Sequence, residues 1–211
     1  MSCDPPSWFD HVFSQPRLIP YVNAARLDGT HAVDRYQWNL QASEAFHPAL
    51  SCLEISLRNA LQVKLHGLYG RADWWVAAPL RKVDDDKIRR VQADVRIRKG
   101  AKASADDIIA ELSFGFWVSL LNRTYDRRFW VPALHGAFPH YQGNRRALYD
   151  NFDAMRLLRN RIMHHEPIHH RHLEADHAKI YRLLGYMAPD AVVWLKRFDR
   201  VPVVLAGRPR P

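Results

Sequence analysis

The sequence has little cysteine and no long apolar run, and both absences narrow what the protein can be. Its 211 residues include two cysteines, Cys3 and Cys52, so there is no disulfide framework and we expect a reducing, cytoplasmic environment. No stretch of 18 apolar residues occurs, and the first residues lack the basic and apolar regions of a secretory signal. With 47% hydrophobic and 25% charged residues, the composition is that of a soluble globular protein.

Several common catalytic signatures are also absent. The chain has no Walker phosphate loop, no G-x-S-x-G and no G-x-G-x-x-G, so NTPase, serine-hydrolase and dinucleotide-binding functions lack support. The segment 165–169 formally matches the zinc motif H-E-x-x-H, but Pro167 would break the helix that must hold both histidines. We therefore predict no metal and no cofactor. Metal binding stays open as an alternative for some of the clustered histidines: His165, His169, His170, His172 and His177.

Positive charge is what the sequence has in excess, and it is unevenly distributed. The net charge is +9, with −1 in residues 1–80 and +10 in residues 81–211. A basic half favours a polyanionic partner, nucleic acid first, because Lys and Arg displace counterions from phosphates. Within the basic stretch 81–102, three side chains share one helix face and are spaced to follow an RNA backbone: Arg89, Arg96 and Lys99. A solvated basic face accounts for the same pattern.

Apolar periodicity predicts an all-α fold, arranged as one domain over residues 1–211 with short disordered ends at about 1–7 and 206–211. Ser104 followed by Asp107 predicts a capped helix start. Residues 122–143 are expected to form an irregular connection, and the only extended segment expected is a short edge near Val201–Leu205. Helices are expected at about 16–27, 31–46, 48–69, 83–99, 105–121, 144–165, 172–187 and 190–198.

The segment 48–69 has a regular leucine pattern. Ile55 and Val63 lie on the face opposite the leucines, which predicts a central helix that is buried on both sides. Glu54 and Arg58 are four residues apart at the margin of the leucine face, where an ion pair within the helix is the simplest interpretation. The leucines at helical spacing are Leu50, Leu53, Leu57, Leu61, Leu65 and Leu68.

The segment 144–165 places a charge within an apolar stripe. Arg159 falls in the middle of the face formed by the apolar residues at 148, 152, 155 and 162. A guanidinium there has to be paired, lie in a cleft or face a partner subunit; the alternative is a core-edge arginine that reaches outwards or pairs with Glu54. His164 lies about 140° around a regular helix from Arg159. Pro167 predicts that the helix loosens at His165, so the two side chains converge only through that loosening or through a second copy of the chain.

These residues carry a family resemblance. The pattern Arg159-Asn160-x-x-x-His164, inside Leu-Leu-Arg-Asn-Arg-Ile-Met-His-His-Glu-Pro-Ile, resembles the R-x4-6-H signature of HEPN domains (higher eukaryotes and prokaryotes nucleotide-binding). Its flanks are similar to the Abi-like (abortive infection) branch, and the resemblance extends over about residues 15–200. Further similar segments are Tyr36-x-Trp38-Asn39, Leu53-Glu54-x-x-Leu57-Arg58-Asn59-Ala60, Trp74-Trp75 and Leu112-Ser113-Phe114-Gly115-Phe116-Trp117.

The resemblance implies a helical-bundle endoribonuclease of a bacterial toxin–antitoxin or phage-defence system, which acts as a homodimer without metal. Histidine would move protons and arginine would hold the phosphate while the RNA 2′-OH attacks, leaving a 2′,3′-cyclic phosphate. Arg159 and His164 are the expected catalytic residues, with Asn160 as an orienter. The expected supporting residues are Glu54, Arg58, Asn59 and His165, and the expected RNA contacts are Arg156 and Arg161 with the basic face at 89–99. Besides RNA, a cognate antitoxin (protein or RNA) is an expected partner; the alternative is a non-catalytic HEPN module that binds RNA, nucleotides or another protein.

Overall fold

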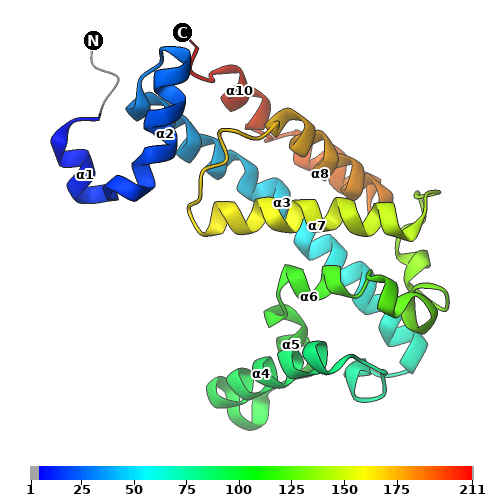
Figure 1. Cartoon of the computed structure of the whole chain (residues 1–211). Coiled ribbons are helices and arrows are strands. Elements are labelled where there is room, and N and C mark those ends of the chain that lie inside the picture. The colour runs from blue at the N-terminus through cyan, green and yellow to red at the C-terminus, as the bar shows by residue number, and fades with distance from the viewer. Residues whose placement is uncertain (1–4, 211) are drawn as a thin grey trace. The chain divides into compact units, whose positions relative to one another are not determined.

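A computed structural model describes residues 5–210 of the chain. Within this range all regular secondary structure is helical, which confirms the all-α fold class (Figure 1). None of the helices in these residues combines the length and apolarity needed to cross a membrane. The α-helices are α1 (Ser7–Phe13), α2 (Gln15–Asp28), α3 (Ala32–Tyr69), α4 (Lys82–Lys99), α5 (Ala105–Glu111), α6 (Phe114–Ser119), α7 (Arg145–Met163), α8 (Leu173–Met187), α9 (Pro189–Lys196) and α10 (Val201–Ala206).

The chain divides into two compact units. Of the described residues, the first unit contains 5–50, 157–181 and 194–210, and the second contains 51–156 and 182–193. Each unit has a core of its own. An aromatic cluster of Phe9, Tyr21 and Tyr36 belongs to the first unit, and a stacked pair of Tyr125 and Phe129 belongs to the second. The single domain expected over residues 1–211 stays a prediction.

Helix α3 is one helix where the sequence predicts two. It runs through Pro48 without interruption, although proline removes one helical hydrogen bond and costs about 3 kcal/mol in a helix interior. Phe46 and Leu50, on either side of the proline, are almost fully buried. Burying a side chain of this size contributes roughly 1.5–3 kcal/mol. Packing of the two neighbours therefore offsets the cost of the proline.

The second half of α3 buries its leucine face but not the opposite one. The leucines from 50 to 65 are at most 3% exposed, as the spacing predicts. Ile55 and Val63, in contrast, are 44% and 66% exposed, and Leu68, predicted to continue the packed leucine face, is 37% exposed. The expectation of a central helix covered on both sides is therefore wrong. One helical face is packed as far as Leu65, and three apolar residues remain on the surface.

The segment predicted as one helix over 105–121 is broken in the middle. Ser104 and Asp107 form the predicted capping box at the start of α5, with each side chain accepting from the other residue's backbone N–H. The chain then leaves α geometry at Leu112, which has an extended ψ of 127°. Ser113 caps a new helix by accepting from the Phe116 N–H. Each helix start thus has its own cap, which explains two short helices in place of one long one.

Residues 122–143 are more ordered than the irregular connection we expected. They contain two short 3₁₀ helices, η3 (Arg123–Tyr125) and η5 (Leu134–Ala137), and one π-helical turn between them, η4 (Asp126–Trp130). Tyr125 and Phe129 project from these turns and are fully buried. The Tyr125 hydroxyl donates to the buried carboxylate of Asp84 at 2.8 Å, which ties the start of α4 to this connection. Aromatic burial therefore folds a segment whose prolines and glycines prevent a long helix.

Both ends of the described range differ from expectation. Residues 1–4 and 211 lie outside it, but Ser7 already begins α1. The edge expected near Val201–Leu205 is helix α10, with these two residues buried on one side. Beyond this helix, Arg208 donates to the His169 carbonyl and lies 5.0 Å from the Trp38 ring centroid. Within the end expected to be disordered, at about 206–211, Ala206 thus belongs to α10 and Arg208 makes side-chain contacts.

Candidate functional site

Helix α7 keeps its regular hydrogen bonding as far as His164. The His164 N–H donates to the Asn160 carbonyl at 2.9 Å, four residues earlier. His165 then adopts a left-handed conformation with a φ of +57°, so the chain leaves the helix there, as the following proline predicted. The loosening thus begins one residue too late to turn His164 towards Arg159.

The turn at the end of α7 closes in a way that usually employs glycine. The His165 N–H donates to the Ile162 carbonyl at 3.1 Å, and the Glu166 N–H donates to the Arg161 carbonyl at 2.8 Å. This is the Schellman arrangement, in which the residue at the His165 position must be left-handed. A residue with a Cβ atom pays about 1 kcal/mol for this conformation. Backbone strain is therefore concentrated directly after the candidate catalytic histidine.

The candidate residues of α7 divide between two sides of the helix. Arg159 continues the buried side and is half-buried; it is not free of interactions. His164 is exposed, and helical spacing places Asn160 and Arg161 on the same side. The structure thus brings Asn160, Arg161 and His164 together on an accessible surface. Within one chain it leaves Arg159 on a different side of the helix.

Arg161 is held beside His164 by the loop that follows. One of its terminal nitrogens lies 3.5 Å from the Glu166 carboxylate and 3.4 Å from the Pro167 carbonyl oxygen. The side chain remains partly exposed, so its other N–H groups are available to a ligand. A cation and an imidazole are therefore adjacent on one surface, an arrangement suited to binding and transforming a phosphodiester.

The loop 164–172 is held in place on its buried side by Asn39 of α3. The Asn39 side-chain oxygen accepts two backbone hydrogen bonds, from the Ile168 N–H at 2.8 Å and the His169 N–H at 3.1 Å. Asn39 is 2% exposed, so both amides depend on it rather than on water. Sequence reasoning did not select Asn39 as a site residue, although it stands in one of the segments that resemble the Abi-like branch. Its position requires a side-chain acceptor that reaches both N–H groups.

Two arginines hold the same loop through its carbonyl groups. Arg17 of α2 donates to the His165 carbonyl at 2.7 Å, and Arg208 donates to the His169 carbonyl. Together with the contacts of Asn39, they join three distant parts of the first unit to one short segment. The result is a supported platform at the end of α7, with His164 on its accessible side.

His169 is buried within this platform and differs in character from the exposed histidines. It is 5% exposed, and its Nε2 atom has no hydrogen-bond partner in the structure. Burial, together with the positive charges of Arg35, His170 and Arg208, lowers the pKa of His169 to about 4. His169 is therefore neutral at physiological pH and acts as part of the core.

Two other histidines of the cluster, His177 and His172, have structural partners of their own. The His177 ring lies 2.6 Å from the Asp199 carboxylate, which also accepts from the Tyr181 hydroxyl at 2.7 Å. His172 accepts from the Ala175 N–H at the start of α8. Among residues 5–210 there is no group of three or more His, Cys, Asp or Glu side chains that could hold a metal ion. The metal-binding alternative has no ligand cluster in that range to support it.

The expected supporting residues on α3 belong to the second unit. Arg58 donates to the Asn59 side-chain oxygen at 3.2 Å and to the Ala110 carbonyl at 3.4 Å. Glu54 is half-buried and, like Arg159, interacts with at least one other group. These three residues form a polar margin beside the buried leucines.

The expected RNA contacts of the second unit are mostly engaged in ion pairs. Arg89 pairs with Asp85 at 2.8 Å, and Arg156 pairs with Asp153 at 2.7 Å. Lys99 pairs with Asp107, which lowers the pKa of that carboxyl group to about 2. Arg96 differs, because it is exposed and no ion pair engages it in the described part of the chain. The basic face is therefore less charged than its sequence suggests, and Arg96 is its most available cation.

Comparison of the chain with known proteins identifies no relative. No family model matches it, and neither does any curated protein or solved structure. The function is therefore inferred from the geometry at the end of α7 and from the residues that resemble the R-x4-6-H signature.

Proposed function

We propose that this protein is a metal-independent endoribonuclease of the HEPN type, acting in a bacterial toxin–antitoxin or phage-defence (abortive infection) system. The observation that supports this best is the exposed His164, next to Arg161 and Asn160, on a loop held by Asn39. An exposed imidazole on a fixed support can move the protons that metal-free RNA cleavage requires, and the Arg161 guanidinium beside it can bind a phosphate of the RNA backbone.

The reaction uses the nucleophile of the substrate itself. His164 accepts the proton of a ribose 2′-OH, and the oxygen attacks the adjacent phosphorus. The bond from phosphorus to the 5′ oxygen breaks, and a protonated histidine delivers a proton to that leaving oxygen. The products are a 2′,3′-cyclic phosphate and a 5′-OH end. Arg159 binds the non-bridging phosphate oxygens and stabilises the charge that develops in the transition state.

The two sides of α7 explain why the site is proposed to need two chains. One regular helix cannot direct Arg159 and His164 at the same phosphate, and the hydrogen bonding of α7 stays regular up to His164. A two-fold axis near the end of α7 would place each group close to its copy. Leu157, exposed on the same side as His164, and the exposed Met163 supply apolar surface for that contact. We therefore propose a homodimer with the two α7 helices at its interface.

Cleavage of single-stranded RNA in EDTA tests the chemistry. Wild-type protein should cut, and both H164A and R159A should abolish cutting while circular dichroism shows an unchanged fold. H66A, which removes another exposed histidine, should cut normally and serves as the matched control. Undiminished cleavage by H164A, or a strict metal requirement, contradicts the mechanism. RNA binding with no cleavage by wild-type protein would instead identify the non-catalytic module.

Mixing two inactive variants tests the composite site. Combined R159A and H164A chains should regain part of the activity, because one cleft of a mixed dimer can contain both intact groups. Light scattering should first show the mass of two chains. A monomer that still cleaves RNA at micromolar concentration would exclude a site shared between copies.

A further inference from the structure

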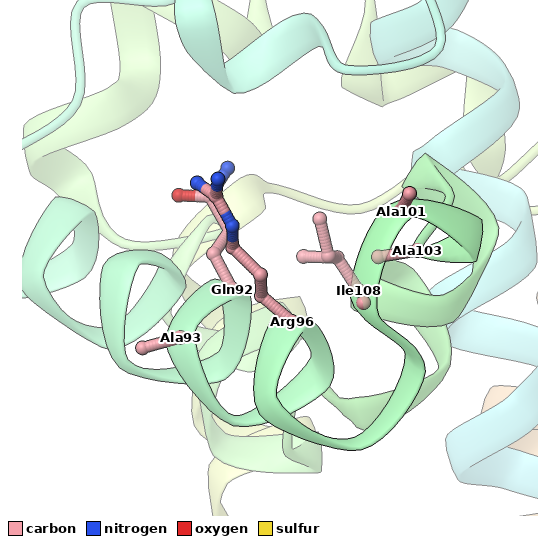
Figure 2. A pocket seen from close by; sticks show the side chains of 7 residues that line it. Gln92, Ala93, Arg96, Ala101, Ala103 and Ile108 are labelled. Carbon is pink, nitrogen blue, oxygen red and sulfur yellow. The ribbon is translucent and has the colours of Figure 1, made fainter.

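A hollow on the second unit has no role in the chemistry described above. It has a volume of about 870 Å³ and lies between the last turns of α4 and the segment that leads into α5 (Figure 2). Gln92 and Arg96 rise side by side from α4 on one side of it, and Ile108 lies across from them with two alanines (Figure 2). The six residues labelled there are Gln92, Ala93, Arg96, Ala101, Ala103 and Ile108.

The charges around the hollow single out Arg96 as the group that can bind an anion. Arg98 pairs with Glu111 at 2.9 Å, and Lys99 pairs with Asp107. The two other basic residues in the last turn of α4 are therefore both engaged in ion pairs. Arg96 is exposed, lines the hollow and has no ion pair within residues 5–210. A guanidinium presents a planar set of donors that matches the oxygens of a phosphate. The hollow therefore contains one available phosphate-binding group.

The opposite side of the hollow is suited to a flat apolar group. Ile108 is half-buried and presents its side chain to the hollow, next to the methyl groups of Ala101 and Ala103. Gln92 adds a carboxamide, which has both donors and an acceptor, beside the guanidinium. Unpaired bases of RNA are bound with one face on an aromatic or arginine side chain and their edge hydrogen-bonded. In this hollow Ile108 and the two alanines supply the apolar contact for the face, and Gln92 the hydrogen bonds for the edge. The volume also lies within the range of sites for small ligands.

We propose that this hollow binds one nucleotide of single-stranded RNA. Arg96 binds its phosphate, Ile108 and the two alanines contact the base, and Gln92 hydrogen-bonds the base edge. The inference rests on the proposed function only in taking RNA as the substrate, and it does not require His164 to be catalytic. A free nucleoside monophosphate offers the same phosphate and base, so the experiment separates these two sources.

The test uses full-length H164A protein, so that RNA is bound without being cut. Affinities for labelled 12-residue oligouridylate and oligoadenylate are measured by fluorescence anisotropy at several salt concentrations. R96Q should weaken binding about tenfold and reduce the salt slope by about one. R90Q makes the same charge change on the same helix, away from the hollow, and should alter affinity less than twofold. Q92A should change the ratio of the two oligonucleotide affinities.

Each result decides the proposal. Equal losses in R96Q and R90Q would show a general charge effect and overturn it, as would oligoglutamate competing as well as RNA. Adenosine and uridine monophosphates, titrated by calorimetry, identify the source. If a monophosphate binds and loses its binding in R96Q while R96Q leaves both oligonucleotide affinities unchanged, the hollow takes free nucleotides and the RNA site is overturned. If R96Q in otherwise wild-type protein cuts RNA with an unchanged KM, the hollow fails while the proposed function stands. If wild-type protein does not cut RNA but R96Q weakens RNA binding, the proposed endoribonuclease function fails while the nucleotide site in the hollow stands.

Discussion

Asn39 offers the sharpest test of how the platform under His164 is built. N39A removes the one acceptor that serves the N–H groups of Ile168 and His169. A buried N–H left without a partner costs roughly 1–3 kcal/mol, so two such groups cost roughly 2–6 kcal/mol. Alanine gains about 0.5 kcal/mol of helix propensity over asparagine in α3, which is too little to compensate. Since a domain is stable by about 5–15 kcal/mol, we expect a large loss of stability.

Urea unfolding followed by circular dichroism gives the change in unfolding free energy, and hydrogen exchange of residues 166–171 shows where it arises. The matched control is N122A, because the Asn122 side chain also accepts a backbone N–H, that of Thr124 at 3.0 Å, but at an exposed turn. Its loss should be about 0.5–1 kcal/mol, since water replaces the acceptor. If N39A loses no more unfolding free energy than N122A, or if hydrogen exchange at 166–171 does not accelerate, Asn39 does not hold the loop.

Two further predictions concern the histidines of the same loop. H165G should stabilise the protein by about 1 kcal/mol, seen as a rise of a few degrees in Tm, because glycine accepts the left-handed φ of +57° without strain; an unchanged or lower Tm would contradict this. For His169, the folded-state pKa of about 4 lies below the ordinary 6.5, so the unfolded chain binds more protons between these values. Stability should therefore rise with pH over that interval, by about 3 kcal/mol in total, and fall as the solution is acidified. H169Q should flatten this part of the profile while H172Q, at an exposed position, leaves it intact; an equally steep profile in H169Q would refute the assignment.

Local patterns in the sequence predicted a good part of this molecule. Leucine spacing identified the packed face of α3, and Ser104 with Asp107 predicted the start of α5. Pro167 predicted the end of α7 near His165. Each of these features depends on residues within one or two helical turns, where side-chain direction and backbone geometry are set by the residues themselves.

Other features were decided by contacts that no local pattern shows. Two helices, at about 31–46 and 48–69, were expected around Pro48, yet buried neighbours keep α3 continuous through it. Val201–Leu205 was expected to be extended, since valines favour strands, but it is helical with one side packed. In both places the intrinsic preference amounts to a few kcal/mol or less, and packing exceeds it.

The candidate site shows the same division. The sequence by itself determined that Arg159 and His164 stand on different sides of one helix, because helical geometry fixes the angle between them. The tertiary structure decided that His164 is exposed, that His169 is buried and neutral, and that Asn39 holds the loop between them. Asn39 is 129 residues from Ile168 in the chain, and only folding brings them into contact. A hydrogen bond at that separation leaves no periodic trace in the sequence, because neither residue's neighbours are constrained by it.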